Sequence, residues 1–184
     1  MRELVASGRA PRNQVSGNET DERAMMEKVT ILVDAQNVYY TTKQAYRCGF
    51  DYNAFWKTAT SGRDIVRAIA YSSERGDPAQ RQFQNILRAI GFEVKLKPYI
   101  QRADGSSKCD WDVGITIDAL EAAKDSSVLV LVSGDGDFDV LVEKLTMDLD
   151  VETEVYGVPG LTAASLIKAA SKYVPIANGL LLKK

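Results

Sequence analysis

Short apolar runs alternate with stretches of helical periodicity from residue 29 onward. The apolar runs have the length and composition of buried parallel strands. They lie at Val29–Asp34, Asp64–Ser72, Phe92–Lys97, Ser127–Ser133 and Val151–Gly157, and a last short strand is expected at Tyr173–Ile176.

Amphipathic stretches separate these strands. The clearest is Pro78–Ile90, which begins with proline, places Phe83 and Leu87 on one face and is followed by Gly91. The other predicted helices are Val38–Tyr46, Tyr52–Thr60, Asp112–Lys124, Asp139–Leu149 and Leu161–Ser171. Repeated alternation of strand and helix predicts an α/β fold with a central parallel sheet of about five strands and helices on both faces.

The N-terminal segment differs from the rest of the chain. Residues 1–28 are polar and lack a sustained period, so we expect an arm, in part disordered, outside the core. Residues 29–184 are expected to form one domain, which is an ordinary length for a single core.

The amino-acid composition excludes several classes of catalytic and metal site. The 184 residues include no histidine, which excludes Ser-His-Asp and Cys-His catalysis and imidazole zinc sites. The two cysteines, Cys48 and Cys109, lack the spacing of a zinc or redox pair. No apolar stretch reaches the ~20 residues of a membrane helix, and no GxGxxG motif indicates a dinucleotide cofactor. We expect a cytoplasmic protein that makes no membrane contact.

Aspartates gather where strands are predicted to end. Asp34 ends the first strand, and the sequence Ser133-Gly-Asp135-Gly-Asp137 follows the most apolar one. Ligands of open α/β sheets bind at the carboxyl ends of the strands. Each aspartate alone is also explained as a turn residue or helix N-cap, but their shared placement favours a site.

A third acidic group precedes the helix that begins at Asp112. We assign the N-cap to Asp110 and expect Asp112 to face the top of the sheet. Asp118 is about 240° further round the helix and does not share that face; it is expected to touch the site from the side or to pair with Lys108 or a neighbouring helix.

Crowded carboxylates repel one another, and a divalent cation relieves that repulsion. Magnesium and manganese prefer oxygen ligands, and such ions activate water and stabilise the leaving oxygen in phosphodiester cleavage. The aspartates therefore suggest metal-dependent phosphoryl chemistry that needs no histidine.

Charge is unevenly distributed. Residues 61–108 hold nine basic and five acidic side chains, whereas residues 109–184 hold six and thirteen. A basic rim beside an acidic pocket suits a polyanion. Arg75, Arg102 and Lys108 lie in predicted loops nearest the strand ends and are the candidate phosphate contacts, with simple solvent exposure as the alternative.

Three motifs resemble the NYN domain family (LabA-like proteins) of the PIN-like nuclease superfamily: VDAQN at 33–37, KCDWDVGITIDA at 108–119 and SGDGDF at 133–138. The resemblance runs from about Val29 to Ile176 and implies a PIN-like Rossmannoid sheet with a metal-dependent ribonuclease site. The residues it implies are the metal aspartates Asp34, Asp112, Asp135 and Asp137, with Asn37, Ser133 and Asp118 in support.

One feature departs from the family pattern. Asp110 adds an acidic residue to the Lys-x-x-Asp form, so either Asp110 or Asp112 faces the metal; we choose Asp112.

The leading expectation is a Mg²⁺- or Mn²⁺-dependent ribonuclease in which a metal-activated water attacks the phosphorus, with RNA or another nucleic acid as partner. The alternative is a PIN-like RNA-binding or regulatory module that keeps the acidic pocket but performs little catalysis. A haloacid-dehalogenase-like phosphatase ranks low, because its Asp-x-Asp loop normally follows the first strand. The sequence leaves the oligomeric state, the RNA and the choice between RNA and DNA open.

Overall fold

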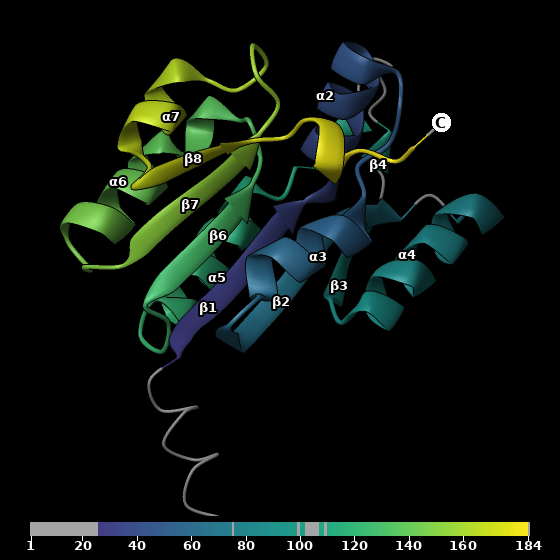
Figure 1. Cartoon of the computed structure of the whole chain (residues 1–184). Coiled ribbons are helices and arrows are strands. Elements are labelled where there is room, and N and C mark those ends of the chain that lie inside the picture. The colour runs from purple at the N-terminus through teal and green to yellow at the C-terminus, as the bar shows by residue number, and fades with distance from the viewer. Residues whose placement is uncertain (1–25, 75, 99, 102–106, 109, 184) are drawn as a thin grey trace, which may run out of the picture.

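The computed structural model describes residues 26–74, 76–98, 100, 101, 107, 108 and 110–183 (Figure 1). Most of the predicted N-terminal arm, and the candidate contacts Arg75 and Arg102, lie outside the described residues, as does Cys109. Within the described part of the chain, no helix has both the length and the apolar composition needed to cross a bilayer.

A sheet of six parallel strands forms the centre of the molecule, in the order β3-β2-β1-β6-β7-β8. The strands are β1 (Glu27–Asp34), β2 (Arg63–Glu74), β3 (Glu93–Pro98), β6 (Val128–Val132), β7 (Glu152–Gly157) and β8 (Lys172–Pro175). The predicted α/β class and parallel sheet are confirmed. The expected count of about five strands becomes six, because the short C-terminal run pairs with β7 as an edge strand.

Helices connect the strands. They are α2 (Ala35–Tyr46), α3 (Tyr52–Thr60), α4 (Pro78–Ile90), α5 (Asp112–Ala122), α6 (Asp139–Met147) and α7 (Ala164–Ala169), with the short 3-10 turns η1 (Gly136–Phe138) and η2 (Asn178–Leu180). The predicted polar loop before Asp112 contains a small antiparallel pair, β4 (Ile100–Gln101) with β5 (Ser107–Lys108). Helix α2 begins three residues earlier than predicted, because Asp34 caps it.

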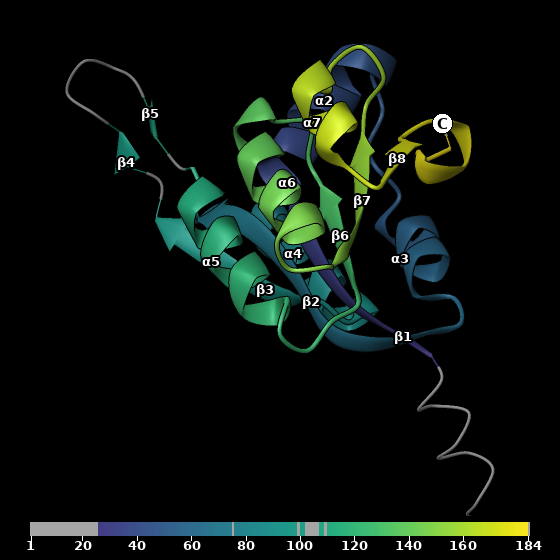
Figure 2. The ribbon, with the colours of Figure 1, turned by 90° about the vertical axis from the view of Figure 1, so that its left-hand side faces the viewer.

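Two apolar cores cover the two faces of the sheet. Side chains alternate along β1, so Ile31 and Val33 contribute to one core while Leu32 contributes to the other. The first core holds Phe55 of α3 and Leu87 of α4, and the second lies under α5, α6 and α7. Figure 2 shows α5, α6 and α7 on one side of the sheet and α3 on the other.

The order of the strands reverses between β1 and β6, since the chain moves outward in one direction to β3 and then returns to build β6, β7 and β8 on the other side of β1. Val33 pairs with Val132, so the next residues, Asp34 and Ser133, leave the sheet side by side. In open α/β sheets, ligands bind at this switch point.

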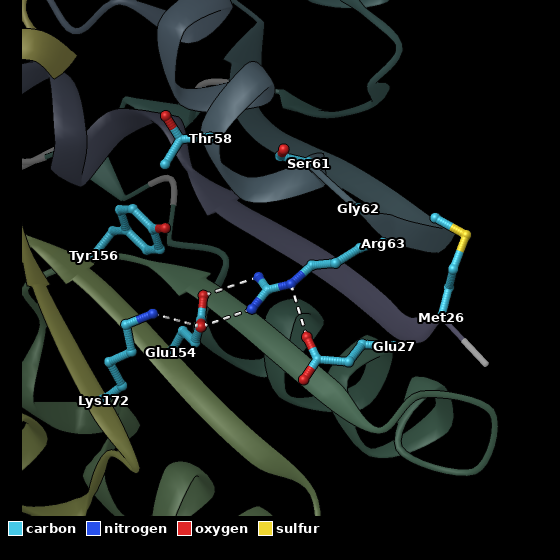
Figure 3. Close-up of a pocket in the computed structure, with 9 residues that line it drawn as sticks. All are labelled: Met26, Glu27, Thr58, Ser61, Gly62, Arg63, Glu154, Tyr156 and Lys172. Carbon is cyan, nitrogen blue, oxygen red and sulfur yellow. Dashed lines mark hydrogen bonds and ion pairs between the residues drawn. The ribbon is translucent and has the colours of Figure 1, made fainter. Parts of the chain in front are cut away.

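An ion-pair cluster lies toward the other end of the sheet, in a broad pocket of about 720 Å³ (Figure 3). Glu154 on β7 is 2% exposed and accepts two hydrogen bonds from Arg63, at 2.9 and 3.1 Å, and one from Lys172 at 3.0 Å. Burial alone would raise the pKa of Glu154, but the bonds from Arg63 and Lys172 outweigh it and hold the pKa below its usual range.

We predict that Arg63→Ala lowers the free energy of unfolding by about 3 kcal/mol at neutral pH, because it leaves a buried carboxylate short of its main partner. The pair stabilises the fold above the unfolded-state pKa of Glu154 and is lost as pH falls below it, so the deficit should shrink in acid. Urea denaturation across this pH range measures both effects. Lys172→Ala is the matched control and should cost less, since that side chain is 55% exposed. A deficit in Arg63→Ala that did not depend on pH would contradict this account.

Candidate metal centre

An open pocket of about 260 Å³ lies at the switch point between β1 and β6. Three segments far apart in the sequence build it: the end of β1 with the first turns of α2, the start of α5, and the loop after β6. Its lining residues are Asp34, Gln36, Asn37, Tyr40, Thr41, Asp110, Trp111, Asp112 and Asp135.

Three aspartates offer carboxylate oxygens that lie within 4.8 Å of one another: Asp112, Asp135 and Asp137. Asp112 is in the first turn of α5, Asp135 is the N-cap of η1, and Asp137 lies within η1. Asp112 and Asp135 are half-buried and Asp137 is exposed, so the cluster opens toward solvent on one side. Oxygen donors at this separation suit a small divalent cation.

Asp34 adjoins this group without belonging to it. Its Oδ1 accepts the Asn37 N–H at 3.0 Å and so caps α2. Burial raises the pKa of the Asp34 carboxyl above its usual range, and the charge of Asp135 adds to this, while the N–H groups of Asn37 and Gln36 oppose it. The residue therefore has a structural role at the start of α2 as well as a place in the pocket wall.

Asp112 has a strongly raised pKa. Burial is the largest cause of a raised pKa there, and the neighbouring Asp110, Asp135 and Asp34 raise it further, to about 7. A carboxyl in this environment holds a proton near neutral pH unless a cation compensates the negative charge.

Asp110 supports the start of α5. Its Oδ1 accepts the Asp112 N–H at 3.1 Å, and its backbone carbonyl accepts a hydrogen bond from Lys97 at 2.7 Å. The Lys97 ammonium also lies 5.5 Å from the ring centroid of Trp111. This arrangement places Asp112, rather than Asp110, in the carboxylate group.

A chain of short hydrogen bonds shapes the loop after β6. Asn37 Oδ1 accepts the Gly134 N–H at 2.9 Å and so joins α2 to this loop. Ser133, which is buried, accepts the Asp135 N–H at 3.2 Å, and Asp135 in turn accepts the Asp137 N–H at 3.1 Å. The predicted supporting residues Asn37 and Ser133 thus hold the loop that carries two of the three clustered aspartates.

The two glycines of this loop are explained by packing. A Cβ on Gly134 would stand 2.6 Å from the carbonyl oxygen of Leu161, which leaves no space for a side chain. A Cβ on Gly136 would stand 3.0 Å from the Cβ of Ala163, a tight contact. The segment before α7 therefore packs closely against the loop at both positions, and it requires glycine at position 134.

Asp118 is the predicted residue that the fold places elsewhere. It is buried, accepts a 2.6 Å hydrogen bond from the Tyr71 hydroxyl and pairs with Lys95 at 2.7 Å and Arg67 at 3.3 Å. Burial alone would raise the pKa of Asp118, but the bonds from Lys95 and Tyr71 keep it below its usual range. Asp118 therefore joins α5 to β2 and β3 and is no part of the carboxylate group.

Of the predicted phosphate contacts Arg75, Arg102 and Lys108, the structure describes only the backbone of Lys108. Lys108 lies in the short strand β5, and the structure does not describe its side chain. The pocket also contains Gln36, Tyr40 and Thr41, which sequence reasoning missed. A signal was present for Tyr40 and Thr41, because both lie on the predicted helix Val38–Tyr46, which follows the strand that ends at Asp34. Gln36 lay outside that prediction, because the helix begins at Ala35 and not at Val38.

The matches to known proteins include all residues of this pocket. The model of the NYN domain family matches residues 28–177. The chain is 26% identical over 157 residues to low amplitude and bright protein LabA from Synechococcus elongatus, covering 81% of this chain and 83% of LabA. It is also similar to the crystal structure of VPA0982, a protein of unknown function from Vibrio parahaemolyticus, with a TM-score of 0.82 and 56% identity over 85% of this chain and 97% of that one. The family resemblance predicted from three motifs is confirmed.

We predict that Asp112→Asn stabilises the metal-free protein by about 1 kcal/mol above pH 7, allowing for solvent screening at this half-buried position. The pKa of Asp112, raised from 3.8 to about 7, means that the fold loses stability as pH rises between those values. The gain should therefore vanish below about pH 4. Thermal unfolding in chelator measures it, with the exposed Asp125→Asn as control. If the variant were no more stable than the parent protein at high pH, ionised Asp112 would not destabilise the fold, and this explanation would be wrong.

We predict that Asn37→Ala costs about 2 kcal/mol of unfolding free energy, because the Gly134 N–H loses its acceptor. Asn37→Asp keeps an acceptor oxygen and should recover part of the loss at low pH, where its added charge is neutralised. Urea denaturation measures both variants, and Asn53→Ala on the exposed side of α3 is the matched control. Equal stability of the two alanine variants would show that the hydrogen bond does not hold the loop.

Proposed function

Because the chain belongs to the NYN domain family, we propose that its nuclease-type domain is a Mg²⁺- or Mn²⁺-dependent ribonuclease. The observation that carries this proposal is the meeting of Asp112, Asp135 and Asp137 within 4.8 Å at the switch point of a parallel sheet. They come from two segments far apart in the sequence, the start of α5 and the loop after β6, and core packing gives no reason for the two to converge.

The residues fit a hard divalent ion. The cluster offers only carboxylate oxygens, and the chain has no histidine. The pKa of Asp112 is raised by burial and then by neighbouring carboxylates, and a cation would relieve both effects. When bound, such an ion supplies a lowered pKa for a coordinated water and stabilises negative charge at a scissile phosphate.

Within this proposal the clustered aspartates hold the ion, and Asp34 adds negative charge from the β1 side of the pocket. Asn37 and Ser133 position the loop, so their effect on activity is indirect. Asp110 fixes the start of α5, which sets the direction of Asp112.

The nucleic-acid backbone would approach from the basic side of the pocket. Lys97 lies there, beside Trp111 and the carbonyl of Asp110. Lys108, Arg75 and Arg102 are further proposed phosphate contacts, carried by the same basic stretch of sequence. RNA is the proposed substrate.

The proposal also covers the domain organisation of the chain and its location in the cell. We propose that residues 29–184 form the NYN domain and that residues 1–28 are an appended arm. A cytoplasmic setting agrees with the free thiol of Cys48.

We predict that the purified protein cleaves labelled single-stranded RNA in Mn²⁺ and that chelator abolishes the cleavage. Asp135→Asn should slow cleavage by about 100-fold or more, because it weakens one of three clustered ligands. Asp139→Asn is the matched control: it makes the same charge change in the first turn of α6, outside the cluster. Cleavage is followed on a denaturing gel.

Equal cleavage by the parent protein and Asp135→Asn would refute the assignment of the site. If the parent protein binds RNA in chelator and never cleaves it with Mn²⁺, the alternative holds instead, namely an RNA-binding or regulatory module with an acidic pocket. Calorimetry of RNA binding beside the cleavage assay separates these outcomes.

A further inference from the structure

A second pocket, of about 410 Å³, continues from the carboxylate pocket on the other side of α2. It lies between the first turns of α2 and the start of α4, beyond the end of β2. The lining residues that matter here are Gln36, Tyr39 and Tyr40 of α2, Ser72 and Ser73 of β2, and Gln80 and Phe83 of α4. Gln36 and Tyr40 line both pockets, so the two adjoin, and we call them together the groove. The volume is in the range of small-ligand sites, roughly 300–1,000 Å³.

The walls of this second pocket are mainly aromatic and apolar. Tyr39 and Tyr40 stand edge to face with ring centroids 5.4 Å apart, and they are 56% and 51% exposed. Phe83 of α4 also lines this pocket. Exposed aromatic rings beside a phosphate-handling site are the usual platform for stacking nucleobases.

One polar atom in the pocket wall lacks a partner. The side-chain oxygen of Gln36, Oε1, is buried and has no hydrogen-bond partner among the described residues, and buried acceptors in folded proteins usually have a donor. Gln36 lines the pocket, and every nucleobase carries N–H donors on its pairing edge. A base seated here would therefore satisfy the Gln36 oxygen once the side-chain amide turns toward the pocket.

The end of β2, which forms one wall of the second pocket, is held in place by hydrogen bonds from Trp111 just before α5 and from Gln80 of α4. The Trp111 indole N–H donates to the Ser72 carbonyl at 3.0 Å, and the Gln80 side chain donates to the Ser73 carbonyl. Both carbonyls belong to the end of β2. The groove is therefore shaped by the fold itself, and a nucleotide whose phosphate lies at the carboxylates would direct its base past Gln36 and Tyr40.

We propose that this second pocket is a nucleobase subsite that receives an unpaired base next to the scissile phosphate. Tyr39 stacks on the base, Tyr40 contacts its edge because the two rings stand at 78° to each other, and Gln36 accepts a hydrogen bond from the pairing edge of the base. The inference rests on the proposed function in that its ligand is a nucleic acid. A base paired in a duplex has no free edge to offer Gln36, so the subsite selects single-stranded substrate.

The test is the binding of two fluorescein-labelled probes, a short single-stranded RNA and a fully abasic phosphodiester of the same length, measured by fluorescence anisotropy in Ca²⁺ buffer. Tyr39→Ala should weaken binding of the RNA by roughly tenfold and leave the abasic probe unchanged, since only the RNA has bases to stack. Gln36→Met, which keeps the side-chain length without the acceptor, should weaken RNA binding by about fivefold, with the abasic probe again unaffected.

Met147→Ala is the matched control, because it removes a 76% exposed apolar side chain on α6; it should bind both probes as the parent protein does. Circular dichroism checks that α2 remains folded in each variant. Equal weakening of both probes, or no weakening of either, in Tyr39→Ala would overturn the base subsite.

This result is independent of cleavage. A protein that never cleaves RNA but shows base-dependent loss in Tyr39→Ala refutes the ribonuclease proposal and supports the subsite. A protein that cleaves RNA in Mn²⁺ while Tyr39→Ala binds RNA normally supports the ribonuclease and overturns the subsite alone.

Discussion

The parallel pairing of β1 with β6 is the constraint on which the rest of the molecule depends. Val33 lies opposite Val132, so the two chains leave the sheet together and in the same direction. Asp34 then caps α2, and the Gly134 N–H donates to Asn37 across the gap between the two strand ends. Without this register, the aspartates of the β6 loop would not meet the pocket wall formed by α2. The position of the site is thus a consequence of sheet order.

The site itself works against the stability of the fold. Carboxylates meet at the switch point, and burial together with their mutual repulsion raises the pKa values of Asp34 and Asp112. Elsewhere the same chain pairs its buried acids fully: Glu154 with Arg63 and Lys172, and Asp118 with Lys95 and Arg67. Acids with lowered pKa values stabilise the fold in their ionised form, whereas acids with raised values destabilise it. This contrast distinguishes Glu154 and Asp118 from Asp34 and Asp112.

Much of the fold was accessible from local pattern. The strand of Val128–Val132 is buried at every position, and the helix of Pro78–Ile90 has the predicted bounds, because apolar runs and capping residues act over short range. Asp118 shows the limit of that reasoning. Its helix position excluded it from the face of Asp112, yet nothing local identified Tyr71 and Lys95 as partners, since both lie on strands far away in the sequence. Gln36 and Tyr40 were overlooked for a related reason: they line a pocket whose other walls include residues of α4, far away in the sequence.

The sequence by itself determined the class of fold, the restriction to carboxylate ligands and the family. Strand periodicity, the lack of histidine and three short motifs can all be read without knowing how the chain packs. Tertiary structure alone decided which carboxylates converge, since Asp112 meets Asp135 and Asp137 only after α5 packs beside the β6 loop. It also decided why glycine occupies position 134, where the backbone of Leu161 leaves no space for a side chain. Distances between segments remote in the sequence depend on the register and packing of the whole sheet, which no single segment contains.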